Sequence, residues 1–196
     1  MDGPKGVLHR YLQVGREVLL WKLEGLSEYE VHRPLTPTGT NLLGIVKHVA
    51  SVEIGYFTGV FGRPCPVDLP WFAPGAPPNG DMWATEHESR ADIVGLYHQS
   101  WRTSDESISA LDLESPGTVA WWKEDRRNVT LHTILVHMIA ETHRHAGHAD
   151  IVRELVDGGT GHRVAAPNLP DLDDAGWAAH RDAIERAARA HRGSAG

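Results

Sequence analysis

Apolar residues recur at helical spacing in four long segments of the chain. The first segment runs from about Pro4 to Leu26, and its apolar residues fall three or four positions apart, at Val7, Tyr11, Val14, Val18 and Trp21. The other three segments cover about residues 40–61, 89–111 and 130–157. Such spacing is typical of amphipathic helices, so the pattern predicts four core helices.

Residues that favour helix ends stand at the borders of these segments. Thr40 or Asn41 can cap the second helix and Ser89 the third, because their side chains accept hydrogen bonds from free backbone N–H groups. Gly158 and Gly159 supply a stop after the fourth helix. The four predicted helices therefore have defined boundaries.

The connecting segments complete the predicted architecture. Residues 31–40 and 62–81 are rich in proline and glycine and are predicted to be loops. A shorter helical pattern covers residues 173–191, and no stretch alternates clearly with the two-residue period of a strand. We predict an all-α fold, a four-helix bundle over residues 1–159, with residues 160–196 forming a linker and a short C-terminal helix packed on or trailing the bundle.

Composition excludes several classes of function. The formal charge of the 196-residue chain is −7 and no basic run stands out, so we expect no nucleic-acid partner. No apolar stretch reaches the roughly 18–20 residues that span a bilayer, and the N-terminus lacks the pattern of a signal peptide. Cys65 is the only cysteine, which excludes an internal disulfide and favours a reducing, cytoplasmic location.

The fourth predicted helix carries metal-binding residue types on its apolar face. At 100° per residue, that face collects Ile134, Met138, Glu141, His145, His148 and Val152. Glu141 and His145 then point inward, whereas His143 points outward and is predicted to be solvated. A buried carboxylate needs compensation. Either Glu141 and His145 form an ion pair one turn apart, or both bind a divalent metal.

The second predicted helix offers a further inward histidine. His48 shares a face with Ile45, Val52 and Gly55. A single core histidine is usually a hydrogen-bonded structural residue, but three inward ligand types on two helices favour a metal site. Two histidines and one glutamate leave a coordination position open, as in catalytic zinc sites. Glu53 lies off the His48 face and is predicted to be solvated.

At these residues the chain resembles the DinB-like metal-dependent bundle superfamily, which includes the bacillithiol and mycothiol S-transferases. The resemblance rests on LLGIVKHVASVE around His48 and on HMIAETHRHAGHADI in the fourth helix. With Glu141 in the motif of the fourth helix, the chain is similar to mycothiol-dependent maleylpyruvate isomerases. The resemblance implies a metal triad of His48, Glu141 and His145, with His148 as an outer-shell residue or fourth ligand.

The resemblance also implies a chemistry. A thiol bound at the open metal position is deprotonated, and the thiolate is the nucleophile. We expect an enzyme, a thiol S-transferase or isomerase, that uses a divalent metal, zinc or alternatively nickel. Its partners are then a low-molecular-weight thiol and an organic electrophile. The many Arg, Ala and Gly residues suggest a GC-rich genome, in which mycothiol is the expected thiol.

Other interpretations stay open. The protein could be a stress-related metal binder without catalysis, or a structural bundle whose His and Glu only pair with each other. A homodimer is an expectation from the family alone. We expect the aromatic residues in and just after the long loop to have one of two roles: they form the wall of a substrate pocket, or they cap the bundle core. These residues are Trp71, Phe72 and Trp83.

Overall fold

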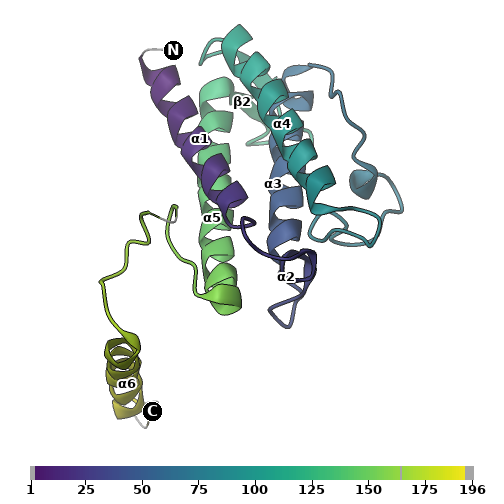
Figure 1. The fold of residues 1–196 in the computed structure, drawn as a ribbon. Helices are drawn as coiled ribbons and strands as arrows, with labels where there is room; N and C mark the ends of the chain where they lie inside the picture. The colour runs from purple at the N-terminus through teal and green to yellow at the C-terminus, as the bar shows by residue number, and fades with distance from the viewer. Residues whose placement is uncertain (1–2, 164, 193–196) are drawn as a thin grey trace.

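The computed structural model of the protein describes residues 3–163 and 165–192. Its main body is a bundle of four helices: α1 (Pro4–Trp21), α3 (Leu42–Phe57), α4 (Arg90–Ala110) and α5 (Leu131–Asp157). Helix α3 packs against both α4 and α5, and α1 packs against α5 (Figure 1). The predicted all-α fold is confirmed, and none of the described helices is long and apolar enough to cross a membrane.

Side-chain caps define the starts of three of these helices; those at Asn41 and Ser89 were predicted, and the one at Thr130 was not. The side chains of Asn41, Ser89 and Thr130 accept hydrogen bonds from the backbone N–H groups of Gly44, Asp92 and Thr133, respectively. Helix α5 ends at Gly158, whose φ of 80° suits a residue without a side chain. Local sequence signals therefore set these boundaries.

Several short elements were not predicted. Helix α1 ends at Trp21 and not near Leu26, and a short helix α2 (Glu28–His32) follows it. A hairpin of two three-residue strands, β1 (Pro116–Thr118) and β2 (Asn128–Thr130), precedes α5. Strands this short cannot show a two-residue alternation. A 3-10 turn, η1 (Gly59–Phe61), precedes the long loop, and a second one, η2 (Pro70–Phe72), lies within it.

The buried face of α1 differs from the apolar stripe in the sequence. Val7, Tyr11 and Val14 are exposed, whereas Leu12 and Leu19 are fully buried. Small residues on the buried side let α1 approach α5 closely: a Cβ at Gly15 would lie 2.5 Å from Nδ1 of His143. The close contact between α1 and α5 decides which side of α1 is buried.

Glu53 corrects one prediction. It was expected in solvent, but its side chain is 0% exposed and pairs with the buried Arg16 of α1, whose Nη2 lies 2.6 Å from Glu53 Oε1. The reason is that α3 is the central helix. It is apolar on nearly all sides and packs against two neighbours, so no face of it is freely solvated. Arg16 also donates to Asp105 of α4, at 2.9 Å.

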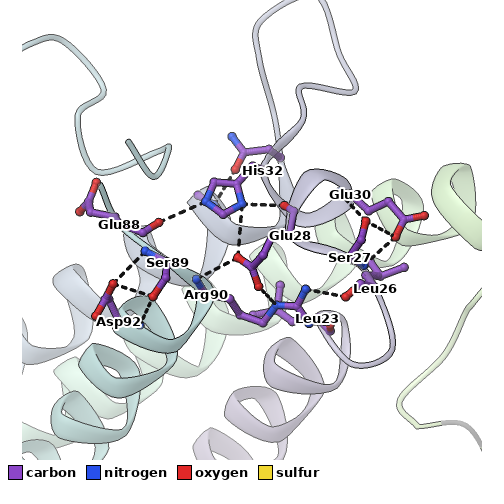
Figure 2. Close-up of polar contacts among 12 residues, drawn as sticks. Leu23, Leu26, Ser27, Glu28, Glu30, His32, Glu88, Ser89, Arg90 and Asp92 are labelled. Atoms are coloured by element: carbon purple, nitrogen blue, oxygen red, sulfur yellow. Dashed lines mark hydrogen bonds and ion pairs between the residues drawn. The ribbon is translucent and has the colours of Figure 1, made fainter. Parts of the chain in front are cut away.

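A polar network fixes α2 against the start of α4 (Figure 2). Arg90 donates hydrogen bonds to the carbonyl groups of Leu23 and Leu26 and pairs with Glu28 at 3.1 Å. One ring nitrogen of His32 contacts the carbonyl oxygen of Glu88 at 3.2 Å. Two capping boxes, Ser27 with Glu30 and Ser89 with Asp92, complete it. The network fixes the segment that leads into α4.

Helix α6 (Asp174–Ala190) forms as predicted, with the side chain of Asp173 as its N-cap. It contains no buried residue, and Figure 1 shows it apart from the bundle, joined to α5 by an extended segment. The division into a bundle over 1–159 and an appended segment over 160–196 stays a prediction.

Candidate metal centre

Three predicted ligands come together between α3 and α5. One donor atom from each of His48, Glu141 and His145 can be chosen so that all three lie within 4.8 Å of one another. Oε1 of Glu141 lies 3.0 Å from Nε2 of His145 and 3.6 Å from Nε2 of His48. The two imidazole rings meet edge to face, with centroids 4.7 Å apart. Both ring nitrogens therefore converge on one carboxylate oxygen.

The site is buried on one side and open on the other. The side chain of His145 is 4% exposed, whereas those of His48 and Glu141 are 18% and 22% exposed. The buried face of α5 runs through Met138, Thr142, His145, Ala149 and Val152. Glu141 lies at the edge of this face and not at its centre, so the donors can be reached from solvent.

The protonation states at neutral pH suit binding of a cation. Burial, together with the nearby His48, lowers the pKa of His145 to about 4, so its ring is neutral and carries a lone pair. Burial disfavours the Glu141 carboxylate, but His145 and His48 outweigh it, and the pKa of Glu141 is lowered. The triad thus offers the Glu141 carboxylate, the neutral ring of His145 and a ring nitrogen of His48, a donor set that fits a divalent ion.

Asp81 is a site residue that the sequence analysis missed. Its Oδ2 lies 2.6 Å from Nδ1 of His48, and its side chain is only 14% exposed. A proton on Nδ1 donated to this carboxylate leaves the lone pair of Nε2 facing Glu141. A carboxylate behind a ligating histidine is common in metal sites, where it fixes the orientation of the ring. Asp81 lies in the long loop, and no periodicity in the sequence relates it to His48.

The first turns of α3 hold the segment that carries Asp81. The Asn41 amide donates to the carbonyl oxygen of Met82 at 3.1 Å, and Lys47 Nζ donates to that of Trp83 at 3.0 Å. The backbone approaches so closely that a Cβ at Gly44 would lie 1.8 Å from the Met82 carbonyl oxygen. Lys47 also pairs with Glu88 at 2.8 Å. Helix α3 therefore positions both His48 and its partner Asp81.

The remaining polar residues of α5 lie outside the triad. His143 is exposed, as predicted. His148 was placed on the inward face, but it too is exposed, and its ring contacts that of His145 at a centroid distance of 5.4 Å. The buried face of α5 includes Thr142 and Ala149, so it is rotated relative to the predicted face and residue 148 lies outside it. Arg144 Nη1 lies 3.3 Å from His145 Nε2 and 3.6 Å from Glu141 Oε1.

The long loop contributes aromatic packing beside the site. Trp71 covers α3: its indole N–H donates to Ser51 at 3.0 Å, and Lys47 Nζ lies 4.1 Å from its ring centroid. Phe72 and Trp83 are more exposed, at 53% and 43%. Trp71 thus acts as a cap on the bundle, which is the second of the two roles expected for these residues.

The match to a known family agrees with this geometry. The sequence model of the Mycothiol-S-transferase family matches residues 7–158. The chain belongs to this family. The matched region contains all of the bundle except the first three residues of α1, includes all three donors and Asp81, and ends at Gly158, the C-cap of α5. Membership confirms the resemblance and indicates a transferase with mycothiol as its thiol substrate. No curated protein matches the chain.

Proposed function

We propose that this protein is a divalent-metal-dependent S-transferase that joins the sulfur of mycothiol to an electrophilic carbon of a small organic molecule. The observation that carries the proposal is the convergence of His48, Glu141 and His145 in a chain that belongs to the Mycothiol-S-transferase family. Zinc is the metal that the two-histidine, one-carboxylate set suits best, with nickel as the alternative.

Each residue has a defined role in this proposal. The lone pairs of His48 and His145 and the carboxylate of Glu141 hold the ion, and the negative charge of Glu141 offsets part of its charge. When bound, the ion supplies an open position at which a thiol loses its proton and becomes a nucleophile. Asp81 keeps the His48 ring in one orientation. The thiol belongs to the co-substrate, because the only cysteine, Cys65, lies exposed in the long loop.

The overall reaction balances without a redox partner. The sulfur electron pair forms a carbon–sulfur bond to the electrophile, and the thiol proton passes to solvent. The electron pair displaced at carbon leaves with a leaving group or, in an addition to a double bond, takes up a proton. An isomerase that uses the thiol transiently would reverse the same addition. A cytoplasmic location and a homodimer stay predictions of this proposal.

Metal analysis of the purified protein tests the proposal first. We expect close to one equivalent of zinc or nickel in the wild type and its loss in His48→Ala. His143→Ala is the matched control, because this histidine lies on the same helix as two of the donors but is exposed. Absence of metal in the wild type after incubation with zinc would refute the proposal and leave the triad as a paired polar cluster.

A thiol-transfer assay tests the reaction itself. The wild type should join mycothiol to a bimane electrophile at a rate that depends on enzyme concentration, and His48→Ala should not. A full metal complement without turnover for any of several electrophile classes would favour the alternative function, a metal-binding protein that does not catalyse thiol transfer.

A further inference from the structure

The interface between α3 and α5 continues beyond the metal-binding triad. His137 lies one helical turn before Glu141 on α5, and Tyr56 lies two turns after His48 on α3. The rings of Tyr56 and His137 contact each other at a centroid distance of 4.8 Å. Because His48 meets residues 141 and 145 while Tyr56 meets 137, the helices run antiparallel here. A second layer of side chains thus lies next to the triad.

An aromatic cavity opens at this second layer. It has a volume of about 460 Å³ and is lined by Trp121, Trp122, Lys123, Arg126 and His137. The indole N–H of Trp122 donates to the Tyr56 hydroxyl at 3.0 Å, and its ring lies 5.1 Å from that of His137. Trp121 contacts Tyr56 at 5.2 Å but is 61% exposed. A large aromatic surface therefore faces solvent next to the triad.

The hairpin that carries both tryptophans is fixed to the bundle. The tryptophans lie in the segment that connects the paired strands β1 and β2. Val119, at the start of this segment, and Val129, in β2, are buried in the core. The backbone N–H of Trp122 donates to the Val119 carbonyl at 3.1 Å. The backbone that carries the cavity walls is thus fixed by packing and hydrogen bonds.

Two positive charges at the cavity have no acidic partner. Neither Lys123 nor Arg126 forms an ion pair with any residue in the described part of the chain, whereas the adjacent Arg127 pairs with Glu124 at 3.5 Å. Asp125, between the two cations, does not line the cavity. In a chain of net charge −7, an aromatic wall with two unpaired cations suits a planar ligand with a negative charge.

We propose that this cavity is the subsite for the electrophile, and that it binds planar aromatic or conjugated acids, with the ring on Trp121 and Trp122 and the carboxylate near Lys123 and Arg126. This inference rests on the proposed function, because it assigns the second substrate of the same centre. His137 lines the cavity and lies one helical turn from Glu141, so a ligand in the cavity lies close to the triad.

Calorimetric titration of the purified full-length protein with two inert probes tests the subsite. The probes are 4-nitrobenzoate and 4-nitrobenzamide, which share shape and ring but differ in charge. We expect the acid to bind about threefold to tenfold more tightly than the amide, as two exposed cations would provide. Equal affinity for the two probes, or binding of neither, would overturn the proposal.

Variants locate the binding. Trp121→Ala should lower the affinity for both probes by about threefold to tenfold, since it removes one exposed wall of the cavity. The double variant Lys123→Ala/Arg126→Ala should abolish the preference for the acid and leave the amide unchanged. Arg127→Ala is the matched control and should change neither affinity, because this arginine is paired and does not line the cavity. An unchanged preference in the double variant would refute the subsite.

Competition and turnover separate this proposal from the proposed function. Saturating mycothiol should leave the affinity for 4-nitrobenzoate unchanged; competition would assign the cavity to the thiol and overturn the inference. Thiol transfer without binding of the acid would refute only the subsite. Binding of the acid by a protein that holds no metal and transfers no thiol would refute the proposed function, and the cavity would no longer be an electrophile subsite.

Discussion

The carboxylate of Asp81 lies 2.6 Å from Nδ1 of His48, and this contact joins the long loop to the triad. It leaves Nε2 of His48 directed toward Oε1 of Glu141, at 3.6 Å. Two of the four residues in this polar cluster therefore depend on how a 20-residue loop returns to the helix that it follows. A lone histidine on α3 would be free to rotate, whereas this one is held.

Removal of Asp81 should weaken metal binding without abolishing it. We expect about 10–100-fold lower zinc affinity in Asp81→Ala, the range found for outer-shell partners of ligating histidines. Asp81→Asn retains an acceptor oxygen and should fall between this variant and the wild type. Chelator competition measures the affinities, with Asp68→Asn, an exposed aspartate of the same loop, as control. Wild-type affinity in Asp81→Ala would show that the contact does not support the site.

Gly44 provides an independent test of the same loop. Its Cβ in Gly44→Ala would lie 1.8 Å from the Met82 carbonyl oxygen, so the segment beside Asp81 must move. We expect a lower melting temperature and a zinc affinity reduced about as much as in Asp81→Ala. Gly55→Ala on the same helix meets no atom within 4 Å and should be neutral or stabilising by up to about 1 kcal/mol. Equal behaviour of the two variants would contradict the close approach.

His148 should contribute little to metal binding. It is exposed, and its ring lies 5.4 Å from that of His145, outside the three converging donors. We expect His148→Ala to keep near one equivalent of metal, with affinity lowered by at most about tenfold, while His145→Ala loses the metal. If both variants lose it completely, His148 is a fourth ligand.

The buried pair of Arg16 and Glu53 should dominate the polar contribution to stability. Burial acts to raise the pKa of Glu53, and the adjacent Arg16 guanidinium opposes this effect. Glu53→Gln leaves Arg16 without its buried counter-charge, so we expect a loss of about 3–5 kcal/mol in the free energy of unfolding. Urea denaturation measures it, and the exposed Glu17→Gln should change it by less than about 0.5 kcal/mol.

The double variant Arg16→Met/Glu53→Met separates pairing from burial. It should be more stable than Glu53→Gln, because no unpaired charge is left in the core. Wild-type stability of Glu53→Gln would instead mean that Glu53 is already neutral in the folded protein.

The sequence by itself determined the four long helices and α6, and which residue types they carry. Asn41, Ser89 and Thr130 mark helix starts because a cap acts on backbone groups within the same turn. The proximity of Glu141 and His145 also follows from one helical turn. Such features are local, and periodicity along a single segment is enough to predict them.

Tertiary structure decided what the helices meet. His48 joins Glu141 and His145 only because α3 and α5 pack side by side, and Asp81 joins His48 only because the loop folds back onto α3. Glu53 is buried because α3 is central and Arg16 faces it from α1. These contacts join residues that are 33 or more positions apart in the sequence. They depend on packing between elements, which the periodicity of one segment does not encode.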